Sequence, residues 1–456
     1  MNVNNLSISK ESSAAEVAEI LLSIGVSQTV IININNEIIC AHPQAQFLVE
    51  IIKEEWRDHE ALFIKVDEQT ECIYIVSIHS SVRGRSEGGV RILSSPGFIA
   101  GVNDCMALSF GMTKKSAYAD IWAGGGKSVI IPYSERIFSL LMKEQAKNER
   151  EITGTFRELM WRNYGGFVAQ MQGAFIIGED MFVNSWDMRT LQSFCIHTSC
   201  HSKLVGGAEN PSPKTALGIY KAMMAVAEVV MPQAPSLKDK KIIIKGVGLV
   251  GYSLAELLYK AGAKLIIYDT DPKAAERITQ LGDDIEMHIF SRREGESESE
   301  FTQRFKIEEL QFLDNTTADI YSPNARSKTL SRELIEVLHV KAIAGAENAQ
   351  IAKDDEAYVV ARLAELGIVC VPDAAINSMG IFSAYQEHIG IIKADFDKKA
   401  DAIYVQTREL LTKAVLQGKT PHHIFIETAL MKAMIPHPIF GHRGIEIIKE
   451  VFEAWK

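Results

Sequence analysis

The alternation of apolar and polar residues in the N-terminal part of the chain predicts a helix followed by strands. Residues 14–25 place apolar side chains at helical spacing, whereas 29–34 and 72–78 are rich in the β-branched and aromatic residues that favour strands. Residues 144–160 and 214–230 return to helical spacing. We therefore expect the first part of the chain to be an α/β region.

A different pattern begins after Pro211. A short apolar strand at 241–245 leads into a glycine turn, a helix and a second apolar strand that ends at Asp269. Further strand-like segments, separated by helical or polar stretches, lie at 318–323, 341–346 and 368–373. This repetition of strand and helix predicts a parallel, doubly wound sheet.

Composition and charge narrow the class of protein. The chain is 47% apolar and 23% charged, as folded globular proteins are, and a net charge of -10 disfavours binding to nucleic acid. The N-terminal segment lacks the basic start and apolar run of a signal peptide, and no apolar stretch is long enough to predict a membrane helix. Six scattered cysteines suit a reducing compartment. We therefore expect a cytoplasmic protein.

The glycine turn has the pattern G-x-G-x-x-G. Gly246, Gly248 and Gly251 follow the strand 241–245 directly and open a helix. In that context the first glycine permits a tight turn, the second lets the backbone approach a pyrophosphate, and the third lets the helix pack on the strand. The positive N-terminus of the helix attracts the phosphates. The segment therefore predicts a dinucleotide site in which a side chain at any of the three positions would collide.

Asp269 selects the form of the dinucleotide. At the end of the second strand, it is placed to accept hydrogen bonds from the adenosine ribose hydroxyls and to repel a 2′-phosphate. NAD is therefore the expected cofactor, and Asp271 could share or replace this role.

These patterns together predict an α/β protein of two domains. We expect a substrate and oligomerisation domain at 1–211, completed by helices in 374–456 that pack back on it. Residues 212–373 are expected to form the Rossmann domain, with an active-site cleft between the two. The run at 195–201 holds two cysteines and two histidines, but its spacing matches no common zinc module, so no metal is predicted.

A lysine preceded by three glycines is the main candidate for chemistry. These glycines predict that Lys127 lies in a crowded turn that faces substrate, and Lys115 stands twelve positions earlier. In a buried pocket beside a second cation, the pKa of a lysine falls, because desolvation and like charge both disfavour the ammonium. Lys127 could then act as a base near neutral pH. A flexible turn with a solvated lysine is the alternative.

The chain resembles the Glu/Leu/Phe/Val dehydrogenase family, above all its leucine and phenylalanine branch. The resemblance covers roughly residues 70–390. Its segments are, in order, GGVR (88–91), GMTKK (111–115), GGGKSVI (124–130), IIGEDM (176–181), NPSPKTALG (210–218), the glycine turn, ADIYSPNA (318–325), IAGAENAQ (343–350) and PDAAINSMG (372–380). The resemblance implies NAD-dependent oxidative deamination of an L-amino acid to its 2-oxo acid and ammonia.

Site residues follow from the resemblance, position by position. Lys115 would bind the substrate α-carboxylate, Lys127 would activate the water that attacks the imino acid, and Asp180 would shuttle the amine protons. Asn377 would hold the substrate carboxylate or amine from the other side of the cleft. The remaining residues that the resemblance implies are Gly88 and Gly89 at the substrate, and Thr215, Ala325 and Asn348 at the cofactor.

Glu87, just before GGVR, bears on the substrate side chain. The resemblance implies a lysine here in the glutamate branch and an apolar residue in the leucine branch, so a carboxylate argues against glutamate as substrate. An ionised Glu87 in the side-chain pocket would favour a basic or hydrogen-donating side chain, because an unpaired buried charge is costly. Alternatively, Glu87 pairs with Arg83 or Arg85 and never meets substrate. Apolar, aromatic, basic and indole side chains all stay open.

Two classes of function fit these observations. The first is an amino-acid dehydrogenase, expected to be a homo-oligomer that binds an amino acid, or its 2-oxo acid and ammonia. The second is a catalytically silent nucleotide-binding regulatory protein that keeps the Rossmann fold. Lys115, Lys127 and Asp180 together favour the enzyme, since a sensor needs neither a base nor a proton shuttle. A hydroxy-acid dehydrogenase would use the same cofactor, but the ordered segments favour amine chemistry.

Overall fold

The structure is a computed structural model that divides into two compact units. It describes residues 8–9, 11–94, 97–145, 153–202, 206–208, 210–325, 328–390 and 395–456. Unit 1 comprises Met1–Glu209, Phe382–Ala394 and Ala429–Lys456, and unit 2 comprises Asn210–Ile381 and Asp395–Thr428.

The division differs from the predicted domains near the C-terminus. Residues 374–381 and 395–428 lie in unit 2, whereas the sequence pattern places all of 374–456 with the first domain. The physical reason is the packing of α15 (Phe396–Gln417) along α7 (Ser212–Val230). Gly218 of α7 permits this contact, because a Cβ there would lie 2.9 Å from Ile403 Cδ1 of α15.

Unit 1 is built, in its described residues, on a mixed seven-stranded sheet in the order β2-β1-β3-β4-β6-β5-β7. β5 is parallel to β6 and β7, and the other pairs are antiparallel. The strands are β1 (Gln28–Ile34), β2 (Glu37–Cys40), β3 (Ala61–Asp67), β4 (Cys72–Ser80), β5 (Ser86–Ile92), β6 (Gly124–Pro132) and β7 (Phe175–Glu179).

Separate hydrophobic cores cover the two faces of this sheet. On one face, Val90 of β5 shares a core with Trp161 of α5, and on the other, Val129 of β6 shares a core with Val102 of α3. Since successive side chains of a strand alternate between faces, this assigns every residue of β5 and β6 to an α5 face or an α3 face. The helices of unit 1 are α1 (Ala14–Ser23), α2 (Phe47–Ile52), α3 (Phe98–Tyr118), α4 (Glu135–Lys143), α5 (Phe156–Ala169), α6 (Ser185–Gln192) and α17 (Arg443–Trp455), with 3₁₀ turns at Pro43–Ala45 and Lys53–Glu55.

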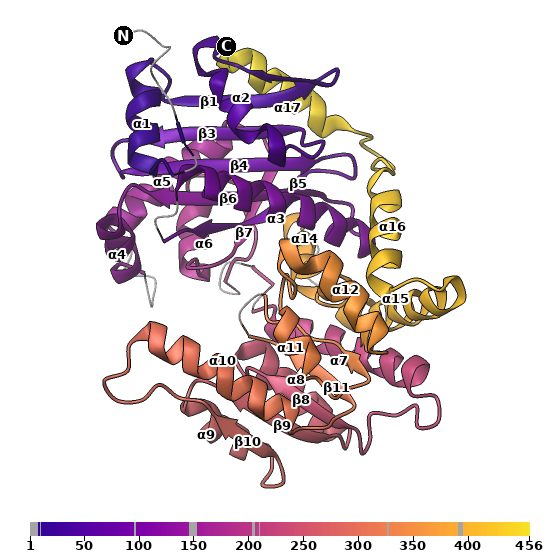
Figure 1. Cartoon of the computed structure of the whole chain (residues 1–456). Coiled ribbons are helices and arrows are strands. Elements are labelled where there is room, and N and C mark those ends of the chain that lie inside the picture. The colour runs from indigo at the N-terminus through magenta and orange to yellow at the C-terminus, as the bar shows by residue number, and fades with distance from the viewer. Residues whose placement is uncertain are drawn as a thin grey trace. The chain divides into compact units, whose positions relative to one another are not determined.

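The C-terminal helix belongs to the core of unit 1. Figure 1 shows α17 beside β1, which comes from the other end of the chain. Its Val451 and Phe452 lie in the same hydrophobic core as Phe63 of β3. Two further helices, α14 (Met379–His388) and α16 (Pro421–Ala433), contribute residues to both units.

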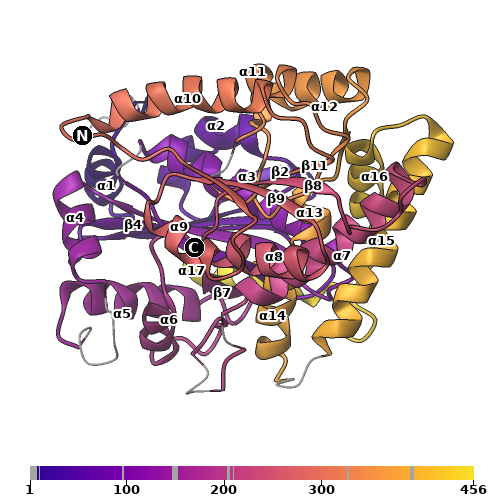
Figure 2. The ribbon, with the colours of Figure 1, turned by 90° about the horizontal axis from the view of Figure 1, so that it is seen from below.

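Unit 2 contains, in its described residues, a parallel six-stranded sheet in the order β10-β9-β8-β11-β12-β13. Numbered from β8, this is the order 3-2-1-4-5-6 of dinucleotide-binding folds, so the predicted doubly wound sheet is confirmed. Helices α10, α11 and α12 pack on one face and α8 on the other (Figure 2). The strands are β8 (Lys241–Lys245), β9 (Lys264–Asp269), β10 (Glu286–Ile289), β11 (Ile320–Pro323), β12 (Ala342–Ile343) and β13 (Val369–Cys370). The helices not yet given bounds are α8 (Leu249–Lys260), α9 (Lys273–Thr279), α10 (Glu298–Asp314), α11 (Arg332–Glu336), α12 (Glu356–Glu365) and α13 (Asp373–Ile376), with a 3₁₀ turn at Lys353–Asp355.

Two local predictions in unit 1 are wrong. The helix predicted over 144–160 begins at Phe156, because Thr155 Oγ1 caps it by accepting a hydrogen bond from the Glu158 N–H (3.1 Å). Residues 146–152 of that prediction lie outside the described residues. The glycines 124–126, predicted to be a turn, form the buried start of β6.

The described parts of the chain were also searched for membrane spans. None of their helices combines the length and the apolar run that crossing a bilayer requires.

Candidate active site

Lys127 lies in β6, on the α3 face. It pairs with Ser77 of β4, and its side chain points to the same face as that of Val129, two residues further on. The helix approaches closely because Gly125 has no side chain: a Cβ there would lie 2.1 Å from Thr113 Oγ1 of α3. The Lys127 side chain is only 7% exposed. Gly125 therefore lets α3 pack closely on β6 beside a buried lysine.

Asp180, immediately after β7, binds two cations. Its Oδ2 atom is ion-paired with Lys127 Nζ and accepts a hydrogen bond from Arg91 Nε of β5 at 2.9 Å. Arg91 also donates from Nη1 to Asp104 Oδ2 of α3 at 3.2 Å. This network of two cations and two carboxylates joins three strands and one helix of unit 1.

The charges around Lys127 go beyond the sequence prediction. The sequence predicts a second cation beside Lys127; the structure places Arg91 there, and between the two cations it places the Asp180 carboxylate, which binds both. Burial raises the pKa of Asp180, but Lys127 and Arg91 outweigh it and bring the pKa down to about 2. Asp180 is thus an anion at neutral pH, held by its two cationic partners. Lys115 lies half-buried in the last turn of α3.

Gly88 and Gly89 allow β5 to run between Lys127 and Asp180. A Cβ on Gly88 would lie 1.8 Å from Gly126 O, and one on Gly89 would lie 2.7 Å from Asp180 Cβ. Neither position can hold a side chain without moving the neighbouring strand. The structure thus gives a packing reason for both glycines, and their contact with substrate stays a prediction.

Glu87 lies two residues before Gly89 in β5, so both positions are on the α3 face of the sheet. It is 3% exposed, and both carboxylate oxygens are buried with no hydrogen-bond partner among the described residues. Burial raises the pKa of Glu87 to about 8. The predicted alternative, pairing with Arg83 or Arg85, is wrong, because Arg83 donates instead to the carbonyls of Ile121 and Lys432. Glu87 is therefore a buried carboxyl group whose oxygens are left without a hydrogen bond by the described residues.

In unit 2 the glycine turn follows β8. Gly246 has a φ of 83°, where glycine is favoured, and a Cβ on Gly251 would lie 2.1 Å from Gly246 O. A Cβ on Gly246 itself would lie 2.9 Å from Ala325 Cβ. Gly248 differs, because a Cβ there meets no atom within 4 Å. The first and third glycines are thus required by the fold, whereas the predicted collision at Gly248 needs a bound ligand.

Asp269 lies next to this turn at the end of β9. Its Oδ2 accepts the Val247 N–H at 2.7 Å, and its Oδ1 accepts the Asp271 N–H at 2.9 Å. Asp271 is in turn paired with Arg277 at 3.3 Å, and Arg277 Nη2 also donates to Val247 O at 3.4 Å. A second carboxylate and its arginine therefore flank the predicted ribose site.

Asn377 and Asn348 are hydrogen-bonded to each other in unit 2. Asn377 Nδ2 donates to Asn348 Oδ1 at 2.9 Å and to Ala346 O at 3.1 Å. Asn377 Oδ1 is buried and has no hydrogen-bond partner among the described residues. Thr215 Oγ1 lies 3.6 Å from the position that a Cβ on Gly380 would take, and Gly380 closely follows Asn377 in the sequence. The structure thus joins Asn348 to Asn377 and places Thr215 near Gly380, and the contacts of Thr215 and Asn348 with the cofactor stay a prediction.

Arg91 and Asp104 were missed as members of the site. Arg91 had a usable signal, because it follows Gly89 by two residues and so lies on the same face of its strand. Asp104 had none, since only the packing of α3 on the sheet brings it to Arg91.

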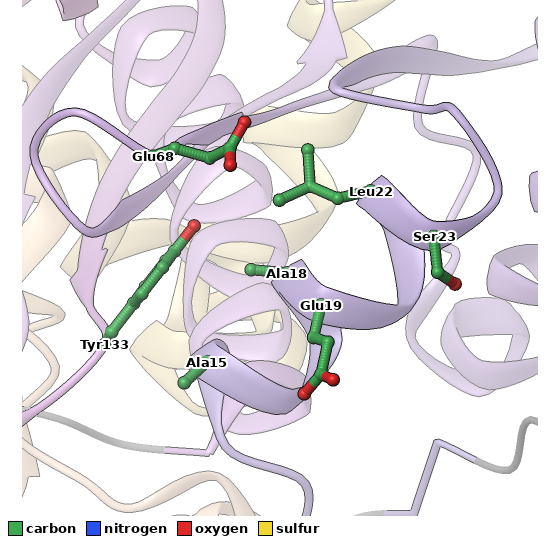
Figure 3. Close-up of a pocket in the computed structure, with 7 residues that line it drawn as sticks. All are labelled: Ala15, Ala18, Glu19, Leu22, Ser23, Glu68 and Tyr133. Atoms are coloured by element: carbon green, nitrogen blue, oxygen red, sulfur yellow. The ribbon is translucent and has the colours of Figure 1, made fainter.

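Other parts of unit 1 offer less chemistry. The described residues include no group of three or more His, Cys, Asp and Glu side chains arranged to hold a metal ion. A cavity of about 520 Å³ lies between α1 and the segment after β6 (Figure 3). It is lined by Ala15, Ala18, Glu19, Leu22, Ser23, Glu68 and Tyr133. Tyr133 follows β6 at the end away from its glycines, so the cavity is separate from the Lys127 network.

The fold of unit 2 and its glycine turn place the chain among dehydrogenases that work with a nicotinamide cofactor. Residues 206–433 match the family Glutamate/Leucine/Phenylalanine/Valine dehydrogenase, and residues 64–194 match Glu/Leu/Phe/Val dehydrogenase, dimerisation domain. The chain belongs to this family.

Named relatives cover most of the chain. Leucine dehydrogenase of Bacillus subtilis (strain 168) is 30% identical over 78% of this chain and 85% of its own length. L-tryptophan dehydrogenase of Nostoc punctiforme is also 30% identical, over 82% of this chain and 92% of its own length. Valine dehydrogenase of Streptomyces coelicolor is 29% identical, over 80% and 89%.

Solved structures agree on the fold. The crystal structure of L-tryptophan dehydrogenase from Nostoc punctiforme has a TM-score of 0.64 at 28% identity, covering 84% of this chain and 98% of that one. Glutamate dehydrogenase from Peptoniphilus asaccharolyticus, at 19% identity, has a TM-score of 0.57 over 83% of this chain and 87% of that one. The second likeness concerns the fold alone.

Proposed function

We propose that the protein is a cytoplasmic, NAD-dependent L-amino-acid dehydrogenase that converts its substrate to the 2-oxo acid and ammonia. The observation that carries the proposal is the buried ion pair of Lys127 with Asp180, in a chain that also has the dinucleotide sheet. A lysine base and a carboxylate proton shuttle are the groups that amine oxidation and imine hydrolysis need. Family membership supports the same chemistry.

The chain's own residues would divide the work as follows. Lys115 would fix the α-carboxylate of the substrate by its charge. The substrate ammonium would bind Asp180 in competition with Lys127, which would remove the carboxylate that stabilises the lysine ammonium. Lys127, after losing its ammonium proton to solvent, would take a proton from the water that attacks the imino carbon, and Asp180 would carry protons to the departing ammonia. Gly88 and Gly89 would leave room for the substrate backbone.

The nicotinamide cofactor supplies the hydride acceptor when bound, and unit 2 supplies its site. Gly246, Gly248 and Gly251 would hold the pyrophosphate at the N-terminus of α8, where Gly248 leaves open space. Asp269 would accept the ribose hydroxyls, and its negative charge supports NAD over NADP. The residues proposed for the remainder of the cofactor are Thr215, Ala325 and Asn348.

Substrate selection would involve Asn377 and Glu87. Asn377 would hold the substrate α-carboxylate or amine, and its buried Oδ1, which has no hydrogen-bond partner among the described residues, can accept a hydrogen bond from the amine. Glu87 shares the α3 face with Lys127 and would line the side-chain pocket. With its pKa raised to about 8, Glu87 would be uncharged at neutral pH and compatible with apolar and aromatic substrate side chains. Its oxygens could also accept a hydrogen bond from a substrate side chain that carries an N–H donor. Glutamate is not expected as a substrate, because Glu87 would stand where a cation is needed to pair with the buried side-chain carboxylate of glutamate.

We further propose that unit 1 is the substrate and oligomerisation part of a homo-oligomer and unit 2 the cofactor part. The match of residues 64–194 to a dimerisation domain supports the first assignment.

Spectrophotometric detection of NADH with each proteinogenic L-amino acid tests the function. We expect turnover with one or more apolar or aromatic substrates, release of ammonia, and loss of turnover in Lys127→Met. Correctly folded protein that binds NAD but stays silent across the panel would instead be the regulatory protein of the alternative hypothesis. Reduction of NAD by 2-hydroxy acids, without dependence of the reverse reaction on ammonia, would identify a hydroxy-acid dehydrogenase.

A further inference from the structure

Two loops of unit 1 lead directly into the strands that carry Glu87 and Lys127. Residues 81–85 connect β4 to β5, and residues 119–123 connect α3 to β6. We call them the entry loops. Glu87 is the second residue of β5 and Lys127 the fourth of β6, so a shift of either loop is transmitted to the site over a few residues.

The entry loops are in backbone contact with each other. The Gly124 N–H donates to Arg85 O at 2.8 Å. A Cβ on Gly84, whose φ is 135°, would lie 2.5 Å from Trp122 O. The two loops therefore have a fixed spacing that side chains at these glycines would disturb.

Arg83 ties both entry loops to the C-terminal part of unit 1. The side chain belongs to the first loop, and its Nε donates to Ile121 O of the second loop at 3.2 Å. Its Cζ lies 4.2 Å from the centre of the Trp122 ring, also in the second loop. Its Nη1 donates to Lys432 O, at the end of α16, at 2.9 Å. One guanidinium thus makes three directional contacts to two separate segments.

Arg83 is buried, and one carboxylate acts on its charge. The residue is 4% exposed, and burial lowers its pKa, whereas Asp120 of the second entry loop raises it. The Asp120 carboxylate is itself paired with Lys432 Nζ at 2.7 Å. Carbonyl oxygens and an aromatic face satisfy the Arg83 guanidinium, and this needs the planar fork that a lysine cannot reproduce. A buried cation held in this way points to a requirement for geometry.

The C-terminal segment is itself attached to the first entry loop at further points. The His437 N–H donates to Val82 O at 3.0 Å. His442 Nε2 lies 2.9 Å from Glu60 Oε1, and Glu60 Oε2 accepts a hydrogen bond from Ser81 Oγ at 2.5 Å. The C-terminal segment that accepts the hydrogen bond from Arg83 is therefore also bonded to the first entry loop, to which Arg83 belongs.

We propose that Arg83 is a positioning residue that sets the spacing between Glu87 on β5 and Lys127 on β6. The inference rests on the proposed function, because this spacing matters only if both side chains meet one substrate. Burial and the charge of Glu87 raise the pKa of Tyr385 of α14, and the charge of Arg83 lowers it. A misplacement of about 1 Å far from the chemistry can reduce the rate by on the order of 100-fold.

The test compares Arg83→Lys with a control of matched stability in the full-length protein. Phe452→Leu is the control, because Phe452 lies in the core of unit 1 and touches neither entry loop. We expect Arg83→Lys to lower kcat by on the order of 10- to 100-fold at a temperature where both variants are folded. The affinity for NAD should stay unchanged, since the glycine turn belongs to unit 2. Methylguanidinium should restore part of the activity of Arg83→Ala.

A second variant covers the case in which Arg83 variants do not fold. Trp122→Phe keeps the arginine and reduces the aromatic face, so it should lower kcat less than Arg83→Lys but more than Phe452→Leu. If wild type is active and both loop variants retain the kcat of the control at equal melting temperature, Arg83 is merely structural and the inference is wrong. Wild type without turnover on any amino acid would overturn the proposed function and the inference with it.

Discussion

Lys127 of β6 and Asp180 after β7 form an ion pair across β5, at the point where Gly89 leaves space between them. The two groups proposed as base and proton shuttle are therefore bonded to each other before substrate arrives. A substrate ammonium that binds Asp180 would therefore have to compete with Lys127 for the carboxylate.

Removal of either partner should abolish most of the turnover. We expect Lys127→Met and Asp180→Asn each to lower kcat by about 10²–10⁴-fold, the usual contribution of a general acid or base. Because the two groups act as a unit, the double variant should be little worse than the single ones. Steady-state kinetics with NADH detection provides the measurement, with the exposed Lys449→Met as control. Fully additive losses would show that the two residues act independently.

Arg91→Met should make the protein less resistant to acid. Arg91 is one of two cations that hold the pKa of Asp180 at about 2, below its ordinary value of 3.8. A lowered pKa contributes stability above pH 3.8 that is lost as the pH falls toward 2. Without Arg91 the pKa of Asp180 rises, so acid unfolding should begin at higher pH. Circular dichroism during acid titration measures this, and an unchanged midpoint would mean that Lys127 alone fixes the charge.

The sequence was sufficient to predict those features that depend on residues adjacent in the chain. The glycine turn at Gly246 depends on a strand before it and a helix after it, and both are visible as local patterns. The family segments also identify Lys127 and Asp180 without any knowledge of their contact. Local patterns thus predicted the sheet of unit 2 and the candidate residues.

Contacts between distant segments were not predictable in the same way. The register of β5, β6 and β7 brings Asp180 to Lys127. The sequence did not predict this register, because the glycines at 124–126 favour a turn rather than the start of a strand. The pairing of Glu87 with an arginine was plausible from spacing alone, yet Arg83 is held by Lys432 O from the C-terminal segment. Strand register and packing between distant segments therefore determine which charged groups contact each other in the site.

Glu87→Gln should change how stability depends on pH. Burial raises the pKa of Glu87 from 4.5 to about 8, so its contribution to stability is full below pH 4.5 and is lost as the pH rises through about 8. Glutamine cannot ionise, so the variant should lose less stability than wild type over that window. Urea unfolding across this range measures the difference. Parallel pH profiles would show that Glu87 is ionised or solvated in the folded protein.

Glu87→Leu should alter the order of substrates. If Glu87 lines the side-chain pocket, leucine should gain kcat/KM relative to substrates with an N–H donor, such as tryptophan and lysine, because the buried acceptor is removed. The panel of leucine, phenylalanine, tryptophan, lysine and glutamate should be measured for wild type and variant. An unchanged order of preference would place Glu87 outside the pocket.

Cofactor selection should depend on the two carboxylates beside the glycine turn. Asp271→Ser would free Arg277 from its carboxylate partner while keeping Asp269, and the double variant with Asp269→Ser would also remove the charge that repels a 2′-phosphate. We expect the ratio of kcat/KM for NADP over NAD to rise in the single variant and further in the double one. Arg277→Met in the double variant should remove the gain. An unaltered ratio throughout would contradict the assigned ribose site.

Gly248 and Gly251 should separate cofactor binding from folding. An alanine at 251 would bring its Cβ within 2.1 Å of Gly246 O, a backbone atom that cannot move aside, so Gly251→Ala should lower the melting temperature. An alanine at 248 meets no protein atom within 4 Å, so Gly248→Ala should keep the melting temperature but weaken NAD binding, because the methyl group fills the space proposed for the pyrophosphate. Calorimetry with NAD and thermal unfolding without it measure the two effects. Gly166→Ala, at an open position of α5, is the matched control. Undiminished NAD affinity in Gly248→Ala would move the dinucleotide away from this turn.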